Sequence, residues 1–270
     1  MNKKIAFIGA GNMGEALIKG LVQSKVVKPE SITAADKRED RLLYLQSHYC
    51  INVEKNNISA AKNSDIVILA TKPHVIERVL QEIQDVITEE KLIISIAAGI
   101  SLATLKKHLS GEARVIRCMP NTPALVLKGI TVICQDDTEE KDLITAKNLF
   151  ESVGTVMILE EKYINIVTAI SGSGPAYYFL IVEAIADGGV RMGLSKSTAL
   201  LLATETMQGA SSLLKETHKH PAELKDMVTS PAGTTSYGLY QLEKGGIRGA
   251  LIDAIESACN RSKELGSNKG

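Results

Sequence analysis

Residues 5–14 read Ile-Ala-Phe-Ile-Gly-Ala-Gly-Asn-Met-Gly, and the interpretation of the whole chain starts from this stretch. Its first four residues predict a strand and the residues after it predict a helix, which is the context that a Gly-x-Gly-x-x-Gly pattern requires. Gly9 permits a tight turn, Gly11 leaves the backbone open to a pyrophosphate, and Gly14 lets the helix pack closely on the strand. The positive end of that helix would face the phosphates. The stretch predicts a dinucleotide-binding site; a turn of purely structural use is the alternative.

Acidic and basic residues follow where the ribose contact is expected. Asp36 lies about twenty residues beyond Gly14, at the end of the next apolar run. Its carboxylate would accept from the 2′-hydroxyl of NADH and repel the 2′-phosphate of NADPH. Lys37 and Arg38 come next and could clamp that phosphate, the arginine in bidentate fashion. Because two positive charges outweigh one negative charge, we expect NADPH to be preferred, with NADH as the alternative.

Composition excludes several classes of protein. The chain of 270 residues carries 31 basic and 31 acidic side chains, so its formal net charge is zero. This balance argues against a general nucleic-acid binder and against polybasic membrane binding. No apolar run approaches the length of a membrane span and the N-terminus lacks a signal-peptide pattern, so we expect a cytoplasmic protein without membrane contacts. The four cysteines and five histidines show no metal-ligand spacing, and we expect no metal site.

The first half of the chain alternates between β-branched runs and amphipathic helices. Such continuous apolar strands are typical of an α/β Rossmann-type fold, a doubly wound parallel sheet with helices on both faces. We expect strands at 5–8, 31–35, 65–71, 92–97, 114–119, 130–134 and 155–159, and helices at about 15–24, 39–48, 57–62, 74–86, 102–109 and 139–152. No helix-length segment separates the strands at 114–119 and 130–134, so these two are expected to pair antiparallel.

From residue 163 onward the pattern indicates helices only. They are expected at 164–169, 176–190, 196–215, 222–227, 235–244 and 247–265. We therefore expect a Rossmann domain at 1–162 followed by an all-α domain at 163–270. The segment 176–186 is apolar on nearly every face, and so small a domain cannot easily bury it alone. A partner subunit is the economical explanation.

Unusual residues follow three of the expected strands, at the ends where parallel sheets bind ligands. The loops are Ala70-Thr71-Lys72-Pro73, Ala97-Ala98-Gly99, and a loop with Asn121 between two prolines. Small residues let a flat ring approach the backbone, and prolines fix a loop without using backbone donors. Each loop alone is compatible with ordinary turn chemistry, but three of them beside a phosphate loop favour cofactor contacts.

Two stretches of the helical half open a helix after glycine and hydroxyl residues. Residues 171–177 read SGSGPAY and residues 230–235 read SPAGTT. Free N–H groups and hydroxyls converge at such a helix start, which suits a small anion such as a carboxylate. Two ordinary capped helix starts would explain the same residues equally well.

With these motifs the chain resembles the pyrroline-5-carboxylate reductase family over its whole length. The matching residues are 7–14, 70–73, 97–99, 117–123, 168–177, 220–221, 224–226 and 230–235, of which SGSGPAY together with SPxGTT is highly specific. The resemblance implies NAD(P)H-dependent reduction of 1-pyrroline-5-carboxylate to L-proline, the last step of proline synthesis. It also implies a helical domain that interleaves with that of a second subunit in a homodimer, with a larger oligomer such as a decamer as an extension.

The motifs and the resemblance together assign the site. The substrate-binding residues are expected to be Ser230, Gly233, Thr234 and Thr235, with the Thr235 hydroxyl as the catalytic group that hydrogen-bonds the ring nitrogen. The expected cofactor-binding residues are Gly9, Gly11, Asn12, Met13, Gly14, Asp36, Lys37, Arg38, Asn57, Ala70, Thr71, Lys72, Pro73, Ala97, Ala98, Gly99 and Asn121. Ala232 departs from the family, which often has a glycine there, and this puts close backbone approach at that point in question.

Two other functions compete with this one. A β-hydroxyacid dehydrogenase has a similar N-terminus, but it would need a catalytic lysine on the helix at 175–185, which contains none. A non-catalytic NAD(P)-binding sensor could share the fold, and the intact substrate motif argues against it.

Overall fold

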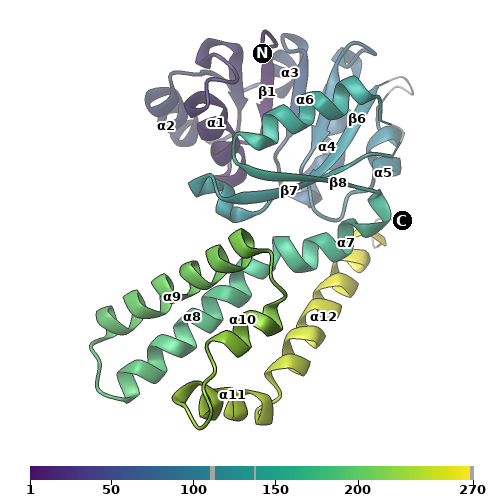
Figure 1. The fold of residues 1–270 in the computed structure, drawn as a ribbon. Helices are drawn as coiled ribbons and strands as arrows, with labels where there is room; N and C mark the ends of the chain where they lie inside the picture. The colour runs from purple at the N-terminus through teal and green to yellow at the C-terminus, as the bar shows by residue number, and fades with distance from the viewer. Residues whose placement is uncertain (110–112, 137, 268–270) are drawn as a thin grey trace. The chain divides into compact units, whose positions relative to one another are not determined.

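The computed structural model describes residues 1–109, 113–136 and 138–267, and Figure 1 shows its ribbon. The chain forms two compact units, one made of Met1–Gly172 with Ala258–Gly270 and the other of Ser173–Ser257. The last three residues of the expected helical domain, 268–270, lie outside the described residues. The boundary between the two compact units lies between residues 172 and 173. The boundary expected at 162/163 divides a nucleotide-binding domain from a substrate-binding domain, and it stays a prediction.

The first unit is built on one sheet, which has eight strands in the described part of the chain, in the order β3-β2-β1-β4-β5-β6-β7-β8. The strands are β1 (Ile5–Ile8), β2 (Ile32–Ala35), β3 (Asn52–Glu54), β4 (Ile66–Leu69), β5 (Leu92–Ser95), β6 (Arg114–Met119), β7 (Gly129–Cys134) and β8 (Gly154–Leu159). The first six strands have the 3-2-1-4-5-6 order of dinucleotide-binding folds. β6 and β7 pair antiparallel and the other neighbours pair parallel, so the predicted fold class and the predicted antiparallel pair are both confirmed.

Helices cover both faces of this sheet. The α-helices of the unit are α1 (Asn12–Gln23), α2 (Glu39–Tyr49), α3 (Asn57–Lys62), α4 (Pro73–Ile83), α5 (Leu102–Lys107), α6 (Glu140–Glu151) and α7 (Ile164–Val167). Phe7 of β1 lies in one apolar cluster with side chains of α1, α2 and α6. Ile8, the next residue, lies in a second cluster with side chains of α3, α4, α5 and α7. β1 is therefore buried on both faces, which explains its unbroken apolar sequence.

Short helical turns complete the first unit. They are the 3₁₀ turns η1 (Pro29–Ser31), η2 (Gln84–Val86), η3 (Thr122–Val126) and η4 (Glu161–Tyr163), and the π-helical turn η5 (Thr168–Gly172). The helix expected at 164–169 is thus an α-helical turn that continues into a π-helical one. β3 was not predicted, because it has only three residues at the edge of the sheet and none of them is buried.

The second unit consists of helices and has very little core of its own. It contains α8 (Gly174–Arg191), α9 (Lys196–Thr217), α10 (Pro221–Met227), α11 (Thr234–Lys244) and the first half of α12 (Ile247–Ser267). Its buried apolar cluster consists of Ala186, Ala199 and Ala203, with Val182 packed against it. On α8, by contrast, Phe179 is 69% exposed. The all-round apolar character expected for 176–186 is therefore present as uncovered surface.

One helical stretch, Glu161–Arg191, is long and apolar enough to cross a membrane by length and composition alone. The expectation that no apolar run approaches such a length is wrong by this measure, because η4, α7, η5 and α8 follow one another directly. The finding is weak evidence for a membrane span, since core helices of soluble proteins pass the same test. Only 22% of its most apolar window is buried within the single chain, so this surface needs a cover that one chain does not supply.

Candidate active site

The three glycines after β1 have three different surroundings. Gly9 has a φ of +102°, and a Cβ there would lie 2.8 Å from the backbone of Ala70. A Cβ on Gly14 would lie 2.7 Å from the carbonyl oxygen of Gly9, so the helix approaches the turn as closely as glycine allows. A Cβ on Gly11 would meet no described atom within 4 Å. The turn is closed at Gly9 and Gly14 and open at Gly11, where a pyrophosphate is expected to approach.

The start of α1 presents backbone donors at this open position. Gly11 is the N-cap of α1, and in the described structure no side chain caps this helix end. The N–H groups of Asn12, Met13 and Gly14 belong to the first turn, which has no intrahelical acceptors for them. Uncapped donors at the positive end of a helix suit a phosphate.

The parallel pairing of β1 with β4 and of β4 with β5 brings further predicted residues to this edge of the sheet. Ala70, Thr71, Lys72 and Pro73 follow β4, and Ala97, Ala98 and Gly99 follow β5. Among the described residues, Thr71 Oγ1 is the one buried side-chain oxygen or nitrogen without a hydrogen-bond partner. It lies beside the turn, because a Cβ on Gly9 would be 2.9 Å from Thr71 Cγ2. An unpartnered hydroxyl next to an open glycine cradle fits a bound nucleotide.

Asp36 lies at the end of β2 as expected, and its carboxylate also holds the glycine turn. Asp36 Oδ2 accepts from the N–H of Ala10 at 2.8 Å. Asp36 Oδ1 accepts from the N–H of Arg38 at 3.0 Å. The side chains of Lys37 and Arg38 are exposed at the start of α2. The structure thus leaves the two cations open to a ligand, while the acid bonds to the protein backbone.

Two of the predicted cofactor residues use their side-chain amides for contacts with the protein. Asn121 is 8% exposed; its Nδ2 donates to the carbonyl of Ser171 at 3.0 Å, and its Oδ1 accepts from the N–H of Ile130 at 2.9 Å. Asn57 Nδ2 donates to Glu82 Oε2 at 3.0 Å. Asn121 therefore connects the loop after β6 to β7 and to the π-helical turn.

Gly99 has a local reason to be glycine that the sequence did not show. Its φ is +72°, which disfavours any other residue. A Cβ on Gly99 would lie 3.3 Å from the Cβ of Leu265, near the end of α12. The last turns of α12 thus pack on one of the loops predicted to contact the cofactor.

Arg41 and Glu15 were not singled out from the sequence, yet both contact the phosphate-binding turn. Arg41 Nε donates to the carbonyl of Ala10 at 2.6 Å, and Arg41 forms an ion pair with Glu15. A charged pair about two dozen residues apart has no short-range signature, and only the folded structure shows it.

The second unit carries the predicted substrate residues on the loop before α11. Gly233 is the N-cap of α11, and a Cβ there would lie 2.1 Å from Ser230 Oγ and 3.1 Å from the Ser230 carbonyl oxygen, so the Ser230 side chain would have to move for any other residue. The N–H of Gly233 donates to the carbonyl of Ser230 at 3.0 Å. Thr234 and Thr235 form the first turn of α11, which no side chain caps in the described structure. The donors that remain for an anion are the N–H groups of these two threonines and the Ser230 hydroxyl.

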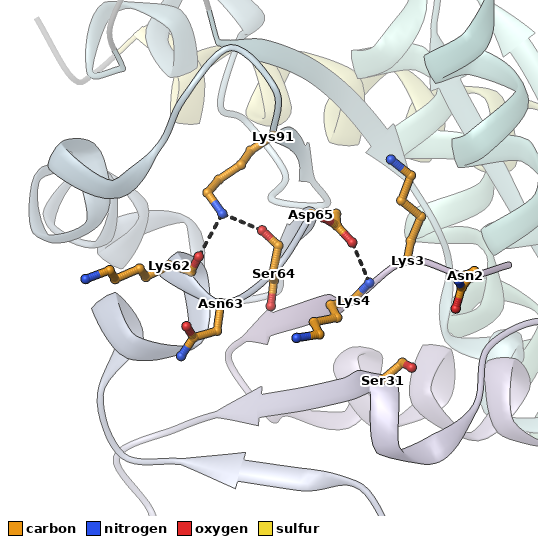
Figure 2. Close-up of a pocket in the computed structure, with 9 residues that line it drawn as sticks. All are labelled: Asn2, Lys3, Lys4, Ser31, Lys62, Asn63, Ser64, Asp65 and Lys91. Carbon is orange, nitrogen blue, oxygen red and sulfur yellow. Dashed lines mark hydrogen bonds between the residues drawn. The ribbon is translucent and has the colours of Figure 1, made fainter.

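A hollow of about 420 Å³ lies at the opposite edge of the sheet (Figure 2). It is lined by Asn2, Lys3, Lys4, Ser31, Lys62, Asn63, Ser64, Asp65 and Lys91. Lys91 Nζ donates to the carbonyls of Lys62 and Ser64, where α3 ends. A cation is favoured at the negative end of a helix, so Lys91 has a structural explanation. Among the described residues, no group of three or more His, Cys, Asp or Glu side chains is placed to hold a metal ion.

We predict that two glycine substitutions separate binding from stability. Gly11→Ala adds a methyl group into open space, so its free energy of unfolding should stay within about 0.5 kcal/mol of the wild type. The same methyl stands where the phosphates approach, so the Kd for NADPH should rise about tenfold or more. Gly14→Ala should instead lower stability by about 1–3 kcal/mol, because its Cβ overlaps the Gly9 carbonyl. Denaturant unfolding measures the stability of each variant, and titration with NADPH measures its Kd. Unchanged NADPH binding by Gly11→Ala would contradict the predicted cofactor site.

We predict that Ala232→Gly stabilises the protein. Ala232 has a φ of +54°, in the left-handed region that costs a residue with a Cβ about 1–2 kcal/mol. After the larger unfolded-state entropy of glycine is subtracted, the gain should be about 0.5–1 kcal/mol in denaturant unfolding. The control is Ala250→Gly on the exposed side of α12, which should lose up to about 1 kcal/mol. Equal effects of the two changes would show that Ala232 is not strained.

Comparisons with known proteins agree with both halves of the chain. The family model for pyrroline-5-carboxylate reductase dimerisation matches residues 161–265, and the model for NADP oxidoreductase, coenzyme F420-dependent, matches residues 4–99. A pyrroline-5-carboxylate reductase from Methanosarcina acetivorans is 46% identical over 266 residues, which are 98% of each chain.

Two solved structures extend this similarity to the fold. A pyrroline-5-carboxylate reductase from Coxiella burnetii matches with a TM-score of 0.91 at 35% identity, covering 99% of this chain and 100% of its own. A pyrroline carboxylate reductase from Plasmodium falciparum with NADP bound matches with a TM-score of 0.90 at 33% identity, covering 98% and 99%. This chain therefore belongs to the pyrroline-5-carboxylate reductase family.

Proposed function

We propose that the first unit holds the nucleotide and the second unit holds the substrate in the family's reaction. That reaction is the NAD(P)H-dependent reduction of 1-pyrroline-5-carboxylate to L-proline, the last step of proline biosynthesis, and this chain is such an oxidoreductase. The observation that carries the assignment of residues is the glycine turn, open at Gly11 and next to the unpartnered Thr71 hydroxyl.

The cofactor residues are those at the carboxyl edge of the parallel strands. The N–H groups of Asn12, Met13 and Gly14 hold the pyrophosphate, and Thr71 Oγ1 bonds to the nucleotide. Ala70, Lys72, Pro73, Ala97, Ala98, Gly99, Asn57 and Asn121 surround it on the neighbouring loops. NADP is bound in a relative that is 33% identical. We infer a preference for NADPH over NADH because Lys37 and Arg38 are exposed at the ribose end, while the Asp36 carboxylate accepts two backbone N–H groups.

The substrate residues are those at the start of α11. The N–H groups of Thr234 and Thr235 and the Ser230 hydroxyl hold the substrate carboxylate at the positive end of that helix. Gly233 keeps Ser230 close to this helix start, since its own N–H bonds to the Ser230 carbonyl and a Cβ there would displace the Ser230 hydroxyl. The Thr235 hydroxyl is the catalytic group, because it can accept from a protonated ring nitrogen and later donate to the product nitrogen.

The chemistry asks little of the side chains. NAD(P)H supplies a hydride to C5 of the cyclic imine. Since the imine can arrive already protonated, no strong side-chain acid is required. The residues of this chain instead hold the carboxylate and orient the ring nitrogen, so that positioning and electrostatics supply most of the effect.

The proposed assembly rests on the apolar surface that the helical unit exposes in the single chain. The family model for dimerisation covers residues 161–265, and the large side chains of α8 are exposed in the single chain. We infer an obligate homodimer through the domain at 163–270, which could be assembled further into a decamer. Such interfaces are large and hydrophobic. A cytoplasmic location without nucleic-acid or membrane partners belongs to the same proposal. The zero net charge supports the part of it that concerns nucleic acid and polybasic membrane binding.

A turnover assay tests the function as a whole. The purified chain should oxidise NADPH when pyrroline-5-carboxylate is added, and should not reduce NADP+ or NAD+ when a β-hydroxyacid is added. Binding of NADPH without any turnover would instead support the non-catalytic sensor. Turnover of the β-hydroxyacid would support the dehydrogenase alternative, which lacks its lysine here.

We predict that Arg38→Ala weakens NADPH use more than NADH use. A bidentate contact between arginine and the 2′-phosphate is a charge-assisted hydrogen bond, so its loss should lower kcat/KM for NADPH about tenfold or more. The value for NADH, which has no 2′-phosphate, should change little. Steady-state kinetics with both cofactors measure the split, and an equal fall would show that Arg38 does not bind the phosphate.

We predict that the Thr235 hydroxyl contributes to the chemical step. Thr235→Ala should lower kcat roughly ten- to a few-hundred-fold, because one preorganised hydrogen bond to the ring nitrogen is lost. The Kd for NADPH should be unchanged, since the nucleotide is held by the other unit. Thr235→Ser keeps a hydroxyl and should retain most of the activity. If the serine variant were as impaired as the alanine variant, Thr235 would act only in the first turn of the helix.

A further inference from the structure

Ala10, between Gly9 and Gly11, is held by charged side chains on both sides of its α-carbon. Its N–H donates to Asp36 Oδ2 at 2.8 Å. Its carbonyl accepts from Arg41 Nε at 2.6 Å. Two successive peptide units of the glycine turn are therefore fixed from outside the turn, one by an acid at the end of β2 and one by a base on α2.

The second of these peptide units, Ala10–Gly11, carries an N–H group at the open part of the turn, where a ligand would bind. The carbonyl of Ala10 and the N–H of Gly11 belong to the same planar, trans peptide, so they point in opposite directions. Because Arg41 holds the carbonyl end, the N–H of Gly11 is directed away from Arg41. A methyl group on Gly11 would have no described atom within 4 Å. The bond from Arg41 thus sets the direction of a donor at the open part of the turn.

Arg41 is itself held by Glu15 of α1. The two side chains form an ion pair and are each 15% exposed. Glu15 Oε1 also accepts from the hydroxyls of Tyr49 at 2.9 Å and Tyr44 at 3.1 Å. The arginine lies over the Tyr44 ring, 5.0 Å from its centre. This network connects α1, α2 and the glycine turn within the first unit.

The charge of this network persists at neutral pH. Burial acts to raise the pKa of Glu15, but hydrogen bonds from Arg41 and Tyr49 and the arginine's charge lower the pKa below its ordinary value of 4.5. Because the pKa of the folded state is the lower one, the contribution of Glu15 to stability is complete above the unfolded-state pKa and is lost as pH falls through the folded one. The clamp on Arg41 is therefore intact under the conditions in which the cofactor is used.

We propose that Arg41 and Glu15 are positioning residues for the cofactor phosphates: Arg41 orients the Ala10–Gly11 peptide and Glu15 holds Arg41 in place. This inference rests on the proposed cofactor site. It differs from a role in choosing between the two cofactors, because the peptide faces the pyrophosphate that NADPH and NADH share. The arginine's Nε and one terminal nitrogen already bond to the protein, which is the arrangement of a support and not of a phosphate ligand.

The test is cofactor affinity in Arg41→Met, Glu15→Gln and a matched arginine variant, Arg114→Met. Arg114 also forms an ion pair, with Asp142, and also donates to two backbone carbonyls, those of Glu89 and Glu90. It lies at the start of β6, at the other edge of the sheet. Its loss should therefore lower the unfolding temperature without changing cofactor affinity.

Fluorescence titration should show the Kd of both NADPH and NADH raised about tenfold in Arg41→Met, the effect of losing a charge-assisted hydrogen bond. Glu15→Gln keeps acceptors for the tyrosines but loses the charge that holds Arg41, so both Kd values should rise by a smaller factor. At saturating NADPH, kcat and the KM for the imine should stay near the wild-type values. In Arg114→Met both Kd values should be unchanged.

Three results would overturn this inference while leaving the proposed cofactor site in place. A rise in Kd for NADPH alone would make Arg41 a ligand of the 2′-phosphate. Unchanged Kd values in Arg41→Met, with normal binding by the wild type, would leave Arg41 with a structural role only. An equal loss of affinity in Arg114→Met would show that lower stability, and not the turn, weakens binding. Failure of the wild type to bind either cofactor would instead overturn the proposed cofactor site, and this inference with it.

Discussion

The parallel pairing of the strands is the constraint on which the candidate nucleotide site depends. β2, β1, β4, β5 and β6 are neighbours that all run in one direction, so the segment after each of them emerges at one edge. Residues as distant in sequence as Gly9, Thr71 and Gly99 come to that edge for this reason alone. Because helices cover both faces of the sheet, polar side chains gather at its edges, and the opposite edge carries lysines, one of which bonds to the end of α3.

The stability of the helical unit is limited by a different factor, which is its small buried core. Three alanines form its buried cluster, while aromatic and aliphatic side chains of α8 remain in solvent. Burial of apolar area is the main favourable term in folding, and so small a cluster supplies little of it. The unit therefore gains most of its stability when its apolar surface is covered. The apolar stretch Glu161–Arg191 includes α8 and lies within the match to the family model for dimerisation, and an interface between subunits needs the same kind of apolar surface as a membrane span.

Much of the fold could be predicted because its signals are local. The spacing of the three glycines between a strand and a helix predicted a tight turn at Gly9 and close packing at Gly14, and a Cβ at either position would overlap neighbouring atoms. The approach of a pyrophosphate at Gly11 stays a prediction. The antiparallel pairing of β6 and β7 followed from the short connection between them. β3 was not predicted from the sequence, because its three residues at the edge of the sheet are not buried and carry no periodic pattern. The contact between Gly99 and Leu265, and the clamp on Ala10 by Arg41, join residues far apart in the sequence, and no propensity or motif encodes such a pair.

Asp36 connects the proposed ribose contact to the geometry of the glycine turn. An acid at this place is usually described by its contact with the ribose, and here it also bonds to the N–H of Ala10. In that peptide unit the carbonyl of Gly9 points the opposite way, and it is this carbonyl that Gly14 approaches so closely. Removing the acid would therefore also remove a hydrogen bond that holds this peptide unit. Lys37 and Arg38 carry no such structural bonds through their exposed side chains in the described structure, so substitutions there should disturb the glycine turn less than substitutions at Asp36.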